Sequence, residues 1–252
     1  MRRIFTLCLA LFAGITMLTA QQIVADGGLS SAKAPRNTIA SLEAAAKAGY
    51  AVKCDVNLLT DGTIVVVEGP WLGETGDPDR MNIQRSDYAM LSSKLLSNGE
   101  AVPTLDSYLD KVAELGDIRL TIEIKEHATP STESDLVKGV VAKVKERKMQ
   151  DGVDYQSTRQ HICNELKRIA PSSATVYFMG NNLTPEYVEG LGYSGICYTV
   201  KALKRIPRWF NEAHKLGLKV AVSGVANAED GAWAKKSGAD FIITTAPATI
   251  KK

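Results

Sequence analysis

Residues 51–68, AVKCDVNLLTDGTIVVVE, contain the strand pair around which the fold is built. The stretch predicts a buried strand, a tight turn at Asp61-Gly62 and a second strand that doubles back. Because side chains alternate along a strand, Lys53 and Asp55 share one face and Cys54 lies on the other. A cation and an anion side by side in an otherwise apolar strand indicate a functional site.

Strands and helices alternate along the rest of the chain. Strands are predicted at 22–25, 51–58, 119–125, 153–156, 175–179, 195–199, 218–223 and 240–244. Helices are predicted at 39–48, 103–115, 133–147, 159–169, 185–191, 206–216 and 228–237. This alternation predicts a closed (β/α)8 TIM barrel with a β-hairpin after its second strand. A doubly wound open sheet is the alternative, which the lack of a glycine-rich phosphate fingerprint after the first strand disfavours.

Residues 69–100 differ from their surroundings. They contain Pro70 and Pro78, many polar residues and no long periodic run. The segment is therefore interpreted as a small insertion, mostly loop, over one end of the fold. No linker divides the remainder, so residues 21–252 are predicted to form one barrel domain.

Residues 1–20 have the pattern of a signal peptide. Arg2 and Arg3 precede an uncharged apolar run, and Ala20 is a small residue at the expected cleavage site. We expect a secreted, periplasmic protein without a membrane span after cleavage. Removal of the two arginines from a formal charge of +2 leaves the mature charge near zero, which argues against nucleic acid as a partner.

Three cysteines, Cys54, Cys163 and Cys197, remain after cleavage. Their odd number and wide spacing fit neither a disulfide framework nor a zinc site. They are predicted to be small buried residues of the core. Trp209 and Trp233, on predicted helices, are expected to serve packing as well.

Charged residues recur where the first barrel strands end. Glu123 and Lys125 are two positions apart in their strand and therefore share a face, as Lys53 and Asp55 do. The carboxyl ends of barrel strands form the working face of this fold, so these side chains should converge. The full predicted set is Asp26, Lys53, Asp55, Glu68, Glu123 and Lys125. Such a cluster is either a structural ion-pair layer or a ligand site.

Several motifs make the chain similar to the glycerophosphodiester phosphodiesterase family of lipid metabolism. They are Ala34-Pro35-Arg36-Asn37-Thr38, Asp55 to Gly62, Ile64 to Glu68, Asn98-Gly99-Glu100 with Pro103-Thr104-Leu105, Ile122-Glu123-Ile124-Lys125, and Gly238 to Thr245. The resemblance covers nearly the whole mature chain and implies a barrel. It also implies a phosphoric diester hydrolase that uses a divalent metal and two histidines.

The departures from that family fall on its working residues. The family's His-Arg-Gly after the first strand is replaced by Asp26-Gly27-Gly28, and its Glu-x-Asp by Lys53-Cys54-Asp55. Glu68-Gly69 stands where the hairpin normally ends in His-Asp. We therefore expect no metal cofactor: Lys53 would take the place of calcium or magnesium, and Asp55 and Glu123 would be residual ligand positions.

The leading hypothesis is an inactive or impaired pseudoenzyme with a pocket for a small anionic or glycerol-phosphate-like ligand. Candidate ligand contacts are Lys53, Asp55, Trp71, Glu123, Lys125 and His127, the last being the only mature histidine near the mouth. The alternative is a metal-independent phosphodiester or glycoside hydrolase around Lys53, Glu68 and Glu123, in which Glu68 and Asp26 replace the histidines as acid and base. A third possibility is a structural partner of an active relative, with the protein partner unknown.

Overall fold

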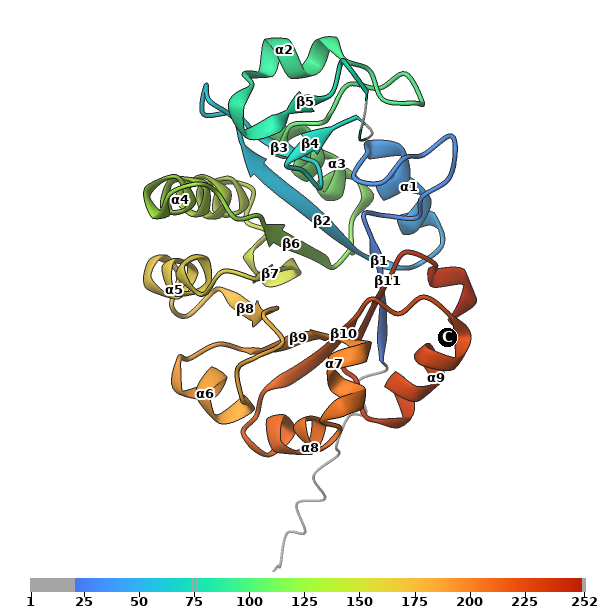
Figure 1. Cartoon of the computed structure of the whole chain (residues 1–252), viewed down its shortest axis with the longest axis vertical. Coiled ribbons are helices and arrows are strands. Elements are labelled where there is room, and N and C mark those ends of the chain that lie inside the picture. The colour runs from blue at the N-terminus through green and yellow to red at the C-terminus, as the bar shows by residue number, and fades with distance from the viewer. Residues whose placement is uncertain (1–20, 74, 76, 251–252) are drawn as a thin grey trace, which may run out of the picture.

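The computed structural model describes residues 21–73, 75 and 77–250, and the predicted signal peptide lies outside this range. Within it, one nine-stranded sheet contains eight parallel strands and β3 (Ile64–Val66), which pairs antiparallel with β2 as the predicted hairpin. Strand β1 pairs with both β2 and β11, which closes the eight parallel strands into a barrel (Figure 1). The strands are β1 (Gln22–Asp26), β2 (Ala51–Leu58), β6 (Leu120–Ile124), β7 (Val153–Ser157), β8 (Thr175–Phe178), β9 (Gly195–Thr199), β10 (Lys219–Ser223) and β11 (Phe241–Thr244). The predicted (β/α)8 barrel is confirmed, and the open sheet is excluded.

Helices surround the barrel on its outside (Figure 1). They are α1 (Ile39–Lys47), α3 (Leu105–Leu115), α4 (Pro130–Glu146), α5 (Gln160–Ile169), α6 (Pro185–Gly190), α7 (Val200–Arg205), α8 (Arg208–Lys215) and α9 (Ala228–Lys236). Threonine side chains at the starts of α1, α3, α4, α6 and α7 accept a backbone N–H of the first turn. Each such cap typically stabilises a helix by about 1 kcal/mol, so local sequence fixes where these helices begin.

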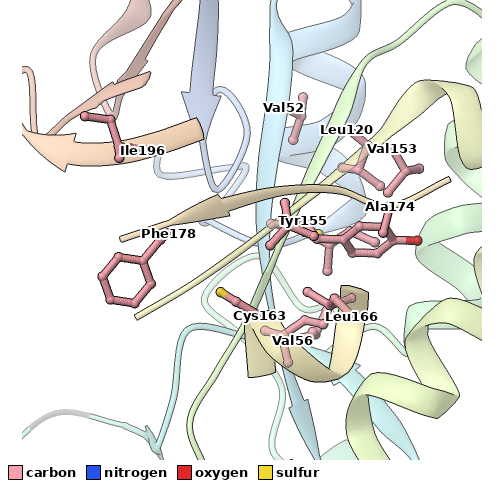
Figure 2. Close-up of a cluster of buried hydrophobic side chains, with 14 of the residues drawn as sticks. Val52, Val56, Leu120, Val153, Tyr155, Cys163, Leu166, Ala174, Phe178 and Ile196 are labelled. Atoms are coloured by element: carbon pink, nitrogen blue, oxygen red, sulfur yellow. The ribbon is translucent and has the colours of Figure 1, made fainter. Parts of the chain in front are cut away.

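The core has an outer and an inner layer. The outer layer packs strand residues such as Val52, Leu120 and Val153 against helix residues such as Cys163 and Leu166 (Figure 2). Burial of one such aliphatic side chain is worth about 1.5–3 kcal/mol, so this layer provides most of the packing free energy. The inner layer fills the barrel itself and consists of Val24, Ala51, Tyr177, Cys197, Ala221 and Ile243.

Three local predictions need correction. Residues 69–100 contain regular structure: β4 (Trp71–Leu72) pairs with β5 (Met81–Asn82), and a 3-10 turn and α2 (Tyr88–Ser93) follow. The helix predicted at 206–216 is α8 at Arg208–Lys215, and a helix that was not predicted, α7, ends just before it at Arg205, because Pro207 disfavours helical backbone at Ile206. Helix α4 starts three residues earlier than predicted, because Pro130 occupies its first turn, where proline is well accommodated.

The expectations for cysteine and tryptophan are confirmed. Cys54, Cys163 and Cys197 are free and buried, and burial raises the pKa of the Cys163 thiol to about 12. Trp209 is buried in the core, and Trp233 packs its ring 5.7 Å from that of Phe210. Among the described residues, no helix combines the length and the apolar character needed to cross a membrane.

Candidate functional site at the barrel mouth

The charged residues of β1, β2 and β6 lie side by side inside the barrel. Strand register places Asp26 opposite Lys53, and Asp55 opposite Glu123. Each of these side chains points into the barrel because it shares the face of an inner-layer residue, as Lys53 does with Ala51. The charged side chains of β2 and of the end of β6 therefore converge, as predicted.

Lys53 lies at the centre of the cluster. Its Nζ is 2.7 Å from Glu123 Oε2, 2.8 Å from Asp55 Oδ1 and 3.0 Å from Asp26 Oδ1, and its side chain is only 7% exposed. Burial by itself would lower the pKa of Lys53, but the carboxylates of Asp55, Glu123 and Asp26 raise this pKa well above its usual value. The ammonium is therefore charged and surrounded by carboxylates over the whole physiological pH range.

Lys125 provides a second cation above this centre. Its Nζ lies 2.6 Å from Glu123 Oε1 and 3.5 Å from Asp55 Oδ1, and a quarter of its side chain is exposed. Burial would raise the pKa of Asp55, but Lys53 and Lys125 together lower it to about 2. Each retained carboxylate is thus shared between two ammonium groups.

Asn37 orients the Asp55 carboxylate. Its Nδ2 donates to Asp55 Oδ2 at 2.9 Å, and its Oδ1 accepts the backbone N–H of Asp55 at 3.1 Å. Asn37 adopts a left-handed backbone with φ of 62°, which asparagine tolerates better than most residues. Because Asn37 holds Oδ2, the other oxygen of Asp55 faces the two lysines.

Arg36 adds a third cation at the rim. Its two terminal nitrogens lie 3.1 Å from Asp26 Oδ1 and 2.8 Å from Glu68 Oε2, and its Nε donates to the backbone oxygen of Asp26. Glu68 is the most exposed acid of the group, at 57%. Neither Arg36 nor Asn37 was predicted to belong to this site, although both lie in the quoted motif at residues 34–38.

His127 and Trp71, two of the predicted ligand contacts, have partners outside the group of charged residues around Lys53. His127 is buried: its Nε2 accepts the backbone N–H of Leu58 at 3.1 Å, and its Nδ1 lies 3.1 Å from the backbone oxygen of Lys125. Nε2 also lies 3.3 Å from the backbone oxygen of Leu58, so the ring is held between backbone groups at the ends of β2 and β6. Trp71 belongs to β4, is 44% exposed and stacks beneath the Arg80 guanidinium, 4.6 Å from its ring centre.

The cluster is close to charge balance. The mouth cluster, defined as Asp26, Arg36, Lys53, Asp55, Glu68, Glu123 and Lys125, contains four carboxylates and three cations. Each cation contacts at least two carboxylates. In the part of the chain that the structure describes, no group of three or more His, Cys, Asp or Glu residues is arranged to hold a metal ion.

A barrel with its polar groups gathered where the strands end has the organisation of (β/α)8 enzymes and their relatives. The model of the glycerophosphoryl diester phosphodiesterase family matches residues 30–249. The chain belongs to this family, as its motifs predicted. No curated protein matches the chain.

Solved structures agree with this assignment. A glycerophosphodiester phosphodiesterase from Parabacteroides distasonis is 31% identical, with a TM-score of 0.84 over 90% of this chain and 93% of its own. Two less similar structures show the same fold. One, from Silicibacter pomeroyi, is described as a putative glycerophosphoryl diester phosphodiesterase (22% identity, TM-score 0.82, 92% of both chains). The other is an Oleispira antarctica phosphodiesterase in complex with the product sn-glycerol-3-phosphate (21% identity, TM-score 0.78, 91% of this chain and 94% of the other).

Proposed function

We propose that this chain is a family member with little or no hydrolytic activity, which binds a small phosphate ester at the barrel mouth. The observation that carries this proposal is the position of Lys53 Nζ, within 3.0 Å of three carboxylates. An ammonium there occupies the centre on which these oxygens converge, and it repels a divalent cation. The donor set therefore does not fit the calcium or magnesium that the family resemblance implies.

The missing proton-transfer groups support the same proposal. Phosphodiester cleavage needs a base for the nucleophile and an acid for the leaving group, and each typically contributes about 10²–10⁴-fold. The two family histidines are absent from the corresponding positions, and His127 is held between backbone groups. Loss of metal and of both proton carriers would leave binding as the remaining property of the site.

A phosphate ester is the ligand class that the surroundings favour. Arg36 and Lys125 are partly exposed cations on opposite sides of Lys53, and the Oleispira antarctica relative binds sn-glycerol-3-phosphate. Cationic side chains bind phosphate oxygens through charge-assisted hydrogen bonds. These two observations support a glycerol-phosphate-like ligand at this mouth.

Turnover and binding must be measured together. We expect a panel of glycerophosphodiesters to remain uncleaved both with calcium or magnesium and with a chelator, while calorimetry detects binding of sn-glycerol 3-phosphate. Metal-dependent turnover would refute the replacement of the metal by Lys53. If no phosphate ester bound, the proposal that the mouth binds such a ligand would be refuted.

The exposed carboxylate of Glu68 keeps one alternative open, a metal-independent hydrolase built around Lys53, Glu68 and Glu123. In that case turnover survives the chelator and is abolished in Glu68→Gln.

We also propose that the protein acts outside the cytoplasm, on the basis of the leader pattern at residues 1–20. Fractionation of the source cells and N-terminal sequencing of the mature chain test this; a cytoplasmic, uncleaved chain would refute it.

A further inference from the structure

The loop that ends β1 and the side chain of Arg36 fit closely against each other. A Cβ atom at Gly27 would lie 2.9 Å from both Cβ and Nε of Arg36, and Gly27 has a φ of 74°. A Cβ at Gly28 would lie 2.6 Å from the backbone oxygen of Ser41. A side chain at position 27 and the present Arg36 side chain therefore cannot coexist in this arrangement.

Backbone contacts hold Arg36 against this loop. The backbone N–H of Asn37 donates to the oxygen of Gly27 at 2.8 Å, and Ser41 Oγ donates to the same oxygen at 2.9 Å. Thr38 and Ser41 cap the start of α1 reciprocally. Only Asn37 separates Arg36 from the N-cap residue Thr38, so the Cα of Arg36 is fixed beside the end of β1.

The Arg36 guanidinium retains donor capacity. It has five N–H groups, and its contacts with Asp26 and Glu68 use three of them. Its side chain is 30% exposed. The Glu68 side chain is more than half exposed, and an ion pair at such a site contributes little and is easily exchanged.

We propose that Arg36 binds the anionic group of the ligand and that Glu68 is its displaceable counter-ion, an inference that rests on the proposed phosphate-ester binding. Compared with the family's His-Arg-Gly loop, Asp26-Gly27-Gly28 lacks a guanidinium, and Arg36 supplies one from the segment before α1. Lys53 does not serve this role, because three carboxylates surround it and its side chain is only 7% exposed. Lys125, a quarter exposed, is the second cation within reach of the mouth.

The two residues are expected to change affinity in opposite directions. Calorimetry with sn-glycerol 3-phosphate and with inorganic phosphate would compare the purified protein with Arg36→Gln, Arg36→Lys and Glu68→Gln. Arg36→Gln should weaken binding about tenfold or more, because a hydrogen bond to a charged group is lost. Arg36→Lys should keep part of the affinity, since lysine retains the charge but not the fork of donors. Glu68→Gln should strengthen binding about two- to fivefold, because the competing carboxylate is removed.

The pair Arg168–Glu165 offers a matched control. It lies in the last turns of α5, at the end of the helix away from the mouth, with Arg168 61% exposed. Arg168→Gln and Glu165→Gln should leave both affinities unchanged. Thermal unfolding of every variant shows whether it is folded; if Arg36→Gln unfolds early, Arg36→Lys and Glu68→Gln decide the result.

The outcomes separate this inference from the proposed function. Binding that is unchanged in Arg36→Gln, or weakened in Glu68→Gln, would overturn the roles of these residues while leaving phosphate-ester binding intact. If Glu68→Gln bound the phosphate esters and the natural protein did not, the role of Glu68 as a counter-ion of Arg36 would be supported. The proposed function of the natural protein would be refuted. No binding by any folded variant would refute both.

Discussion

Ion pairs lie at both ends of the barrel, and they are built differently. At the end away from the mouth, Arg119 and the buried Asp154 form one bidentate pair, with Nε–Oδ2 and Nη2–Oδ1 distances of 2.7 and 2.6 Å. At the mouth, the ammonium of Lys53 contacts three carboxylates, those of Asp26, Asp55 and Glu123. The first arrangement pairs one cation with one anion, whereas in the second each cation contacts at least two carboxylates and Asp55 and Glu123 each contact two lysines.

Opposite pKa shifts accompany this difference. Burial raises the pKa of Asp154 despite the opposing effect of Arg119, while Lys53 and Lys125 overcome burial and lower that of Asp55. Asp55 therefore stabilises the fold above its unfolded pKa of about 3.9, and this contribution is lost as pH falls toward 2. Asp154 favours the fold most below about pH 3.9 and loses that contribution as pH rises through its raised pKa. The contribution of Asp55 at the mouth is thus sensitive to acid, and that of Asp154 at the opposite end is not.

The largest expected effect is that of Lys53→Met. Three carboxylates would lose their shared partner in a site where Lys53 is 7% exposed, so the free energy of unfolding should fall by about 3–5 kcal/mol. Urea unfolding at pH 7 measures this change. Lys138→Met, which removes an exposed pair with Asp135, is the control and should cost less than about 0.5 kcal/mol. A loss at Lys53 as small as that of the control would show that the cluster does not depend on its ammonium.

Lys53→Glu tests whether the mouth keeps the geometry of a cation site. With the family's acid restored beside Asp55 and Glu123, calcium or magnesium at a hundred times its Kd should stabilise this variant by about 2.7 kcal/mol. Thermal unfolding with the ion and with a chelator measures the effect, and the natural protein should show no shift. An equal shift in the natural protein would mean that Lys53 does not exclude the metal.

At the other end, Arg119→Met should cost about 2 kcal/mol at pH 7, because the buried Asp154 carboxylate loses its partner. The cost should be smaller at pH 4, where the raised pKa of Asp154 favours its neutral form. NMR titration of the carboxyl carbons should place the pKa of Asp154 above and that of Asp55 below about 3.9. If the pKa values of Asp154 and Asp55 shifted in the same direction, the two ends of the barrel would not differ in the way described.

His127→Gln should have the smallest effect, about 1 kcal/mol, because it removes bonds that join the ends of β2 and β6. Its affinity for sn-glycerol 3-phosphate should equal that of the natural protein. A tenfold fall in affinity with unchanged stability would instead make His127 a ligand contact, as the sequence interpretation had it.

Periodicity was sufficient to predict the barrel strands and four members of the mouth cluster. Alternation along β2 and β6 predicts which faces carry Lys53, Asp55, Glu123 and Lys125, and closure of a parallel barrel brings those faces together. These inferences use spacing within single strands, so they need no knowledge of how distant loops pack.

The contacts that Arg36 and Asn37 make in the site could not be predicted from strand periodicity. Both lie in an irregular segment whose position against β1 is set by the glycine loop and by the cap of α1. Loop geometry of this kind depends on tertiary contacts, which single-sequence patterns do not encode. The same holds for His127, a predicted ligand contact whose ring nitrogens lie against backbone groups of Leu58 and Lys125.

The contact between Gly27 and Arg36 also has an evolutionary consequence. A Cβ atom introduced at position 27 would lie 2.9 Å from Cβ and Nε of Arg36, so a side chain there requires Arg36 to move or to be replaced. The His-Arg-Gly that the family resemblance implies for this loop is therefore incompatible with the present position of Arg36. The packing of one glycine against one arginine thus couples two positions that are far apart in the motif pattern, and we expect substitutions at positions 27 and 36 to occur together among related sequences.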